Sequence, residues 1–183
     1  MSYLIILSVL ALGFFYFTGV YNKLVRKRTM VEEGWSGIDV QLKKRYNLIP
    51  NLIETVKGYA GHEKETLNEV ISARNSALKA EGITSKVKAE KQLNSALSNI
   101  FALAEAYPDL KANQNFLHLQ QELSSMEGDI EKARRYYNAT VRESNVVVES
   151  FPSNIVANMF DFGLAEFFEV EDQDQREAPK VQF

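Results

Sequence analysis

Residues 112–150 read ANQNFLHLQQELSSMEGDIEKARRYYNATVRESNVVVES, and this stretch decides the fold class. Apolar side chains recur in it at steps of three and four residues, which places them on one face of an α-helix. At a rise of about 1.5 Å per residue, the predicted helix is about 57 Å long. The stripe consists of Phe116, Leu119, Leu123, Met126, Ile130, Ala133, Tyr137, Val141, Ser144 and Val148.

The same helical spacing continues through most of the chain. Further apolar stripes run from Val31 to Ala60, from Leu67 to Leu78 and from Leu93 to Tyr107. No alternation of apolar and polar residues indicates a strand. The sequence therefore predicts an all-α fold, in which two long and two shorter helices form an antiparallel four-helix bundle.

Glycine, proline and hydroxyl residues mark the expected helix boundaries. We expect the first long helix to continue through Pro50 with a bend, because its apolar stripe keeps its phase across the proline. The carbonyl freed at this bend could also form a notch for a partner. The expected boundaries are an end at Gly58 to Gly61, a start near His62, an end near Gly82, an N-cap at Thr84 or Ser85, and an end before Pro108.

The N-terminus carries a long uncharged stretch. Residues 3–21 read YLIILSVLALGFFYFTGVY, and a helix of this length spans about 28 Å, close to the roughly 30 Å hydrocarbon core of a bilayer. A cleaved signal peptide would carry basic residues before its apolar core and a small-residue cleavage site after it. A buried core helix would show a polar face. The stretch has none of these features and therefore predicts a transmembrane helix.

A basic collar follows this stretch directly and consists of Lys23, Arg26, Lys27 and Arg28. Positive residues resist translocation, so this flank should stay in the cytoplasm with the short N-terminus outside. Anionic lipid headgroups explain such a position better than nucleic acid does. No stop signal separates Tyr21 from Val31, so we expect the span to run straight into the first long helix.

A second concentration of apolar side chains follows Pro152. We favour a short helix that closes the open end of the bundle; the other interpretation is an exposed aromatic surface that docks a partner or the membrane. The candidate docking residues are Phe160, Phe162, Phe167 and Phe168. Three segments are thus expected: residues 1–22 as a transmembrane helix, residues 23–168 as a cytoplasmic helical bundle with this cap, and residues 169–183 as an acidic, disordered tail.

Several phrases together resemble the LemA family. The longest is residues 38–59, IDVQLKKRYNLIPNLIETVKGY, with a departure at Asn47, where the family more commonly has aspartate. The remaining phrases are His62-Glu63, YPDLK at 107–111, Phe116, ARRYYN at 133–138, Asn145 and Phe151-Pro152. This resemblance covers nearly the whole chain, from the N-terminal span to Phe168.

The resemblance implies a bacterial membrane protein with an N-terminal anchor and a four-helix cytoplasmic domain. It implies no activity, substrate or cofactor. A related branch of the family helps to organise intracellular membranes in magnetic bacteria, which makes a scaffolding role plausible by analogy.

Composition limits the chemistry that this chain can perform. With 45% hydrophobic residues the chain can form a core, and without cysteine it can form no disulfide, thiolate metal site or cysteine nucleophile. His62 begins the sequence HEKE, which lacks the second histidine of a zinc-protease helix. We predict no catalytic, cofactor or metal residue. The alternative is a metal-dependent hydrolase that uses His62, His118 and carboxylates such as Glu63 and Glu122.

Two rows of polar residues are candidates for contacts. Lys44, Asn47, Asn51 and Glu54 share one helix face, and Glu127, Arg134, Asn138 and Asn145 share another. They are either solvated faces with ion pairs worth about 0.2–0.5 kcal/mol each, or rows that meet between helices and fix their register. The candidate interhelix or partner-binding positions are Gln41, Arg45, Asn47, Pro50, Asn51, Lys57, His62, Glu127, Arg134, Asn138 and Asn145.

These observations favour a non-enzymatic, membrane-anchored helical scaffold or adaptor at the cytoplasmic face of a bacterial membrane. Lipid and a second copy of the chain are the expected partners, the protein partner is open, and no nucleic acid is expected. A channel is disfavoured, since a single span without an ionisable residue offers no lining for ions.

Overall fold

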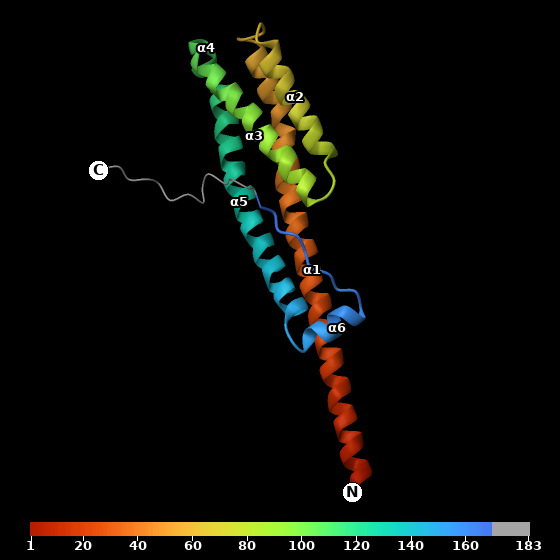
Figure 1. The fold of residues 1–183 in the computed structure, drawn as a ribbon. Helices are drawn as coiled ribbons and strands as arrows, with labels where there is room; N and C mark the ends of the chain where they lie inside the picture. Colours follow the sequence, from red (N-terminus) through yellow and green to blue (C-terminus); the bar gives the residue numbers. More distant parts are fainter. Residues whose placement is uncertain (170–183) are drawn as a thin grey trace, which may run out of the picture. The chain divides into compact units, whose positions relative to one another are not determined.

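The computed structural model describes residues 1–169, so the tail predicted from residue 169 lies, except for Glu169 itself, outside the described residues. All regular secondary structure in the described part is helical, which confirms the all-α prediction (Figure 1). The elements are α1 (Ser2–Lys57), α2 (Lys64–Lys79), α3 (Ile83–Glu105), α4 (Pro108–Lys111), α5 (Gln114–Glu149) and α6 (Ser153–Met159).

The two long helices agree with their sequence patterns. The apolar N-terminal stretch and the first apolar stripe form one continuous helix, α1, which passes through Pro50 and ends directly before Gly58. Helix α5 differs from the expected range of 112–150 by two residues at its start and one at its end. The absence of a break between the predicted span and the first long helix is therefore confirmed.

The predicted start of the third helix is wrong. Helix α3 begins at Ile83, and Gly82 rather than Thr84 or Ser85 occupies the N-cap position. Gly82 adopts a φ of 75°, a conformation that glycine reaches without strain, and its carbonyl accepts the first helical hydrogen bond from the Lys86 N–H at 3.1 Å. With Gly82 at the N-cap, the helix starts two residues earlier than with Thr84 there and three residues earlier than with Ser85.

A short helix that the sequence analysis missed follows α3. Pro108 was expected only to end the preceding helix, yet it also opens the single turn of α4. Proline is tolerated in the first turn because its missing N–H would have no helical partner there. The buried side chain of Leu110 ties this turn to its surroundings.

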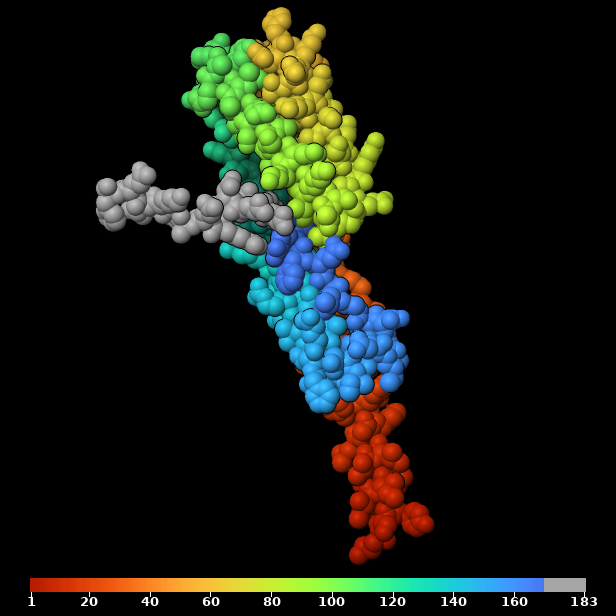
Figure 2. Space-filling view, in the orientation of Figure 1, coloured from red at the N-terminus to blue at the C-terminus, as the bar shows by residue number. Residues whose placement is uncertain are grey.

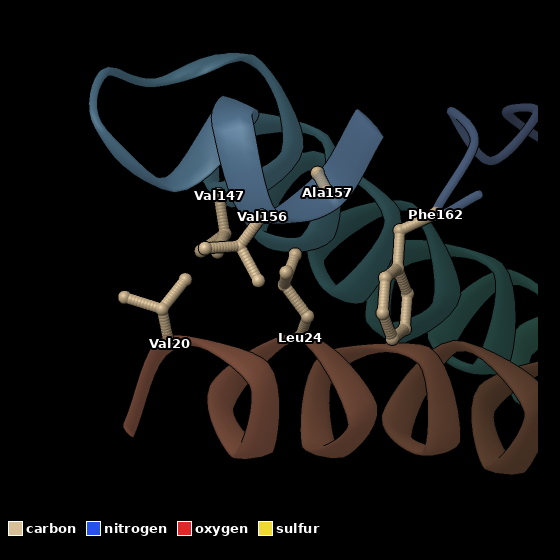
Figure 3. Packing of buried hydrophobic residues seen from close by; sticks show 6 residues of the cluster. All are labelled: Val20, Leu24, Val147, Val156, Ala157 and Phe162. Atoms are coloured by element: carbon tan, nitrogen blue, oxygen red, sulfur yellow. The ribbon is translucent and has the colours of Figure 1, made fainter. Parts of the chain in front are cut away.

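The described chain forms two compact units, and both long helices contribute to each of them. The first unit contains residues 1–44 and 125–167, and the second contains residues 45–124 together with the described residues 168–169. In the first unit, α6 packs against α1 and the end of α5 (Figure 3). The buried cluster there consists of Val20, Leu24, Val147, Val156, Ala157 and Phe162.

In the second unit, α2 and α3 pack along each other, and the core collects the stripes that the sequence predicted. The rings of Phe101 and Phe116 meet edge to face with centroids 6.2 Å apart. Two predicted members of the second stripe lie at its edge, since Ile71 and Leu78 are exposed. The fully buried side chains include Tyr46, Ile49, Leu52, Val56, Leu93, Ile100 and Leu110.

Candidate functional site

The apolar N-terminal end of α1 is the most unusual surface of the first unit. Its large side chains from Leu4 to Phe15 are 56–71% exposed, and no other part of this unit lies over the end in the view of Figure 2. By length and composition, α1 is the one helix among the described residues that could cross a membrane. An exposed surface of this kind is typical of a helix whose neighbours are lipids.

The hydroxyl groups of Ser8 and Thr18 are satisfied by carbonyl groups of the helix itself. The Ser8 hydroxyl donates to the Leu4 carbonyl at 2.8 Å, and the Thr18 hydroxyl lies 3.0 Å from the Phe15 carbonyl and 3.1 Å from the Phe14 carbonyl. Unsatisfied polar groups are expensive in hydrocarbon. The arrangement is therefore compatible with a lipid environment.

The packed part of α1 begins at Phe17, five residues before the boundary expected at residue 22. An aromatic contact joins it to the segment that follows α6. The Phe160 ring lies 5.7 Å from the Phe17 ring and 4.8 Å from the Tyr21 ring, between centroids. The Tyr21 ring is also 5.8 Å from that of Phe162. The last turns of the predicted span thus contact the C-terminal part of the unit.

The basic collar is divided between packing and solvent. Lys27 forms an ion pair with Glu143 of α5 at 2.5 Å, and the hydrogen bond from Lys27 holds the pKa of the Glu143 carboxyl below its usual range. The Arg28 guanidinium lies 5.2 Å from the centre of the Phe162 ring. Lys23 and Arg26 are exposed. Lys23 and Arg26 therefore face solvent, whereas Lys27 and Arg28 also contact side chains of the same unit.

The four candidate docking aromatics differ in exposure. Phe160 and Phe167 are 45% and 37% exposed, whereas Phe162 is 9% exposed and belongs to the cluster of Figure 3. Phe168 is 2% exposed. The buried pair are therefore core residues, and the structure leaves only Phe160 and Phe167 accessible to a partner or to lipid.

Asn145 and Tyr137 hold the chain after α6 in place. The Asn145 amide donates to the Ala165 carbonyl at 3.0 Å and accepts from the Ala165 N–H at 2.9 Å. The Tyr137 hydroxyl donates to the Glu166 carbonyl at 2.7 Å. Burial, helped by the Glu166 carboxylate, raises the pKa of Tyr137 to about 12. Asn145 thus positions the C-terminal segment of its unit.

The other candidate positions differ in their exposure to solvent. Asn47, Pro50, Asn51, Lys57 and His62 are exposed, and Gln41 is half-buried. In the second row, Arg134 and Asn138 are half-buried and Glu127 is exposed. All four residues of the first row, which runs from Lys44 to Glu54, are exposed, as expected for a solvated helix face.

Arg45 is the exception, because it belongs to a buried polar network in the second unit. Its guanidinium pairs with Glu90 at 3.3 Å and donates to Asn94, and the Tyr46 hydroxyl donates to Glu90. The Lys86 ammonium lies 5.9 Å from the centre of the Tyr46 ring and donates to the Ala77 carbonyl at 3.0 Å. The ion pair and the hydrogen bonds give each of these charged side chains a polar partner inside the unit.

Lys86 and Glu90 were not predicted as buried residues, although the sequence contains a signal for them. They precede Leu93 by seven and three residues, so they continue the buried stripe of the third helix. A charged residue in phase with an apolar stripe is expected to be buried and paired.

The metal-hydrolase alternative finds no support in the described residues. No group of three histidine, aspartate or glutamate side chains within residues 1–169 is arranged to hold a metal ion. His62 is exposed, and His118 is an exposed residue of α5 that lies 3.8 Å from Glu122 in the same helix.

Comparisons with known proteins agree with the sequence resemblance. The model of the LemA family matches residues 34–183. Protein LemA of Metamycoplasma hominis is 29% identical over 87% of this chain and 74% of its own length. Magnetosome protein MamQ 2 of Paramagnetospirillum magneticum is 23% identical over 91% of this chain and 71% of its own length. Magnetosome protein MamQ of Magnetospirillum gryphiswaldense is 23% identical over 88% and 70%. Since the family model covers most of the sequence, this chain belongs to the LemA family.

Proposed function

We propose that this protein is a non-enzymatic scaffold or adaptor, anchored in the bacterial cytoplasmic membrane by the N-terminal end of α1. The observation that carries the proposal is the exposure of this apolar end in a helix that continues unbroken into the packed part of the chain. In water, exposed apolar surface costs about 25 cal/mol per Å². Insertion into lipid removes that penalty and turns the exposed end into an anchor.

The orientation follows from the basic collar. Lys23 and Arg26 are exposed immediately after the apolar stretch. Positive residues at this position resist translocation, so they favour the cytoplasmic side of the membrane. In this proposal the N-terminus lies outside and the helices after residue 22 lie in the cytoplasm. Residues 1–22 are the anchor and residues 23–168 the body.

We further propose that the body is an antiparallel four-helix bundle. Helices α1 and α5 supply its two long members, and α2 and α3 supply the shorter ones. The short connections between successive helices support this arrangement, because they favour antiparallel neighbours.

A non-enzymatic role is supported by the use of the polar side chains. The buried charges Arg45 and Glu90 neutralise each other, and Asn145 holds backbone groups of Ala165. These groups serve packing rather than a cleft that could bind a substrate. Two of the relatives carry the name magnetosome protein, which supports a role in a larger cellular assembly.

Crosslinking in cells followed by mass spectrometry tests the scaffold role. If the protein self-assembles, crosslinked species should contain two or more copies, and detergent-solubilised particles should exceed the mass of one chain. An adaptor should instead give reproducible crosslinks to one other protein. A particle that is strictly monomeric in detergent and forms no crosslinks in cells would contradict both versions.

A further inference from the structure

We propose that the outer face of α6 and the aromatic residues beside it form a second membrane-contacting element, which lies in the headgroup region of the leaflet that α1 leaves toward the cytoplasm. The proposal rests on the anchoring of α1 proposed above. The partner that this element contacts is a lipid surface.

The length of the exposed apolar end places this leaflet boundary. Residues 3–16 are exposed, and fourteen helical residues extend only about 21 Å, which is short of the roughly 30 Å hydrocarbon core. The hydrocarbon core of the bilayer must therefore extend along α1 to about Tyr21. The turn from Phe17 to Tyr21 is where the Phe160 ring packs against α1. The segment around Phe160 thus lies at the depth where hydrocarbon gives way to headgroups.

Helix α6 has the two faces that such a position requires. Val156 and Ala157 are 3% and 0% exposed and pack in the cluster with Val20 and Leu24 of α1 (Figure 3). The opposite face presents apolar side chains outward. Ile155 is 53% exposed, Met159 is 63% exposed, and Phe151, two residues before the helix, is 80% exposed. Unpartnered apolar side chains of this kind are stabilised by the acyl-chain boundary of a bilayer.

The surroundings of this face match the chemistry of a lipid interface. A pocket of about 270 Å³, lined by Phe17, Thr18, Tyr21, Asn22 and Phe160, opens at the same level and can receive part of an acyl chain. Lys23 and Arg26 are exposed within about one turn of this level and can pair with anionic headgroups. Apolar side chains with cations beside them are typical of an interfacial segment, and their continuity with the span favours lipid over a soluble protein partner.

Spin labels on single cysteines test this inference, because the chain contains no native cysteine. The variants are Met159→Cys on the outer face of α6, Leu10→Cys in the span, and Tyr136→Cys on α5 as a matched control. Tyr136 is 52% exposed, so it is a partly exposed side chain of the same unit. The full-length chain is reconstituted in vesicles of phosphatidylcholine and phosphatidylglycerol, and collisions of each label with oxygen and with a water-soluble nickel chelate are measured.

Oxygen concentrates in hydrocarbon, whereas the chelate stays in water. We expect Leu10→Cys to collide with oxygen only, Tyr136→Cys to collide mainly with the chelate, and Met159→Cys to resemble Leu10→Cys at a shallower depth. If Met159→Cys is open to the chelate while Leu10→Cys is not, the inference fails and the anchor stands. If Met159→Cys is shielded from both reagents, protein rather than lipid covers α6, and the inference also fails. If Leu10→Cys is itself open to the chelate, the anchor fails and the inference fails with it.

Discussion

The side chain of Asn145 pairs with both backbone groups of Ala165: it donates to the carbonyl at 3.0 Å and accepts from the N–H at 2.9 Å. The Asn145 amide thereby satisfies both backbone hydrogen-bonding groups of a residue that lies outside the helices. The Tyr137 hydroxyl holds the next residue, Glu166, through its carbonyl. The segment between α6 and residue 167 is thus fixed by side chains of α5, which keeps Phe162 in the cluster beneath it.

Replacement of Asn145 should release this segment. Asn145→Ala removes both hydrogen bonds and should lower the free energy of unfolding by about 1–3 kcal/mol, because it leaves partly buried backbone groups of Ala165 unpaired. Amide hydrogen exchange should show the largest loss of protection at Ala165. Asn158→Ala, at an exposed position of α6, is the control and should change stability by less than about 0.5 kcal/mol. Unchanged protection at Ala165 in Asn145→Ala would show that the pair is not required.

Two glycines of α1 should respond in opposite directions to the same substitution. A Cβ at Gly34 would lie 3.2 Å from the Tyr137 Cα and 3.3 Å from the Thr140 hydroxyl oxygen, whereas a Cβ at Gly37 would meet nothing within 4 Å. Gly37→Ala should raise the free energy of unfolding by about 0.5–1 kcal/mol, because alanine lowers the conformational entropy of the unfolded chain. Gly34→Ala should lower it by about 1–3 kcal/mol, because α1 and α5 are forced apart. Thermal and denaturant unfolding measure the stability of both variants. Equal stabilisation by the two substitutions would contradict the close approach of α1 and α5 at Gly34.

Breaking the buried ion pair of Arg45 and Glu90 should cost far more stability than breaking an exposed ion pair, even one with a shorter distance between its charged atoms. Arg45→Met or Glu90→Gln should each lower the free energy of unfolding by about 3–5 kcal/mol, because each leaves a buried polar or charged partner uncompensated. The matched control is Glu105→Gln. Glu105 pairs with Lys111 at 2.5 Å on the surface, and its loss should cost no more than about 1 kcal/mol.

A double-mutant cycle separates the pair from its neighbours. Arg45→Met combined with Glu90→Gln should be less destabilising than the sum of the single substitutions. Strict additivity would mean that the two side chains act independently.

Alkaline pH should destabilise the protein through Tyr137. Its pKa rises from an ordinary value of 10.0 to about 12, so the native state holds a proton that the unfolded chain releases. This contribution is fully present below pH 10 and is lost as the pH rises toward 12. Absorbance titration of the phenolates should lose one late-titrating tyrosine in Tyr137→Phe. That variant should also show a smaller loss of stability between these pH values; an unchanged titration curve would contradict the assignment.

The helices could be predicted because their signals are local. The stripe from Phe116 to Val148 appears in the sequence at the spacing of a helix face, and α5 follows it closely. The start of α3 could not be predicted in the same way, because Thr84 and Ser85 are good caps in isolation and only the backbone conformation of Gly82 decides between the possibilities.

The contacts of the polar residues were less predictable, since they depend on tertiary neighbours. Asn47 and Asn145 look alike in sequence, yet the first is exposed and the second holds Ala165. Likewise, both Phe160 and Phe162 follow α6, but only Phe162 is directed into the cluster. Glu90 was in principle detectable, because it occupies a position in an apolar stripe.

The most direct test of the central claim is the labelling of two cysteines placed in the same helix, α1, on either side of the proposed membrane. Ser2→Cys lies before the apolar stretch and Ser36→Cys lies after the basic collar, and both positions are exposed. In intact spheroplasts, a membrane-impermeant maleimide should label Ser2→Cys, and it should label Ser36→Cys only after the membrane is permeabilised. Labelling of Ser36→Cys in intact spheroplasts, or protection of Ser2→Cys until permeabilisation, would contradict the proposed membrane-spanning orientation.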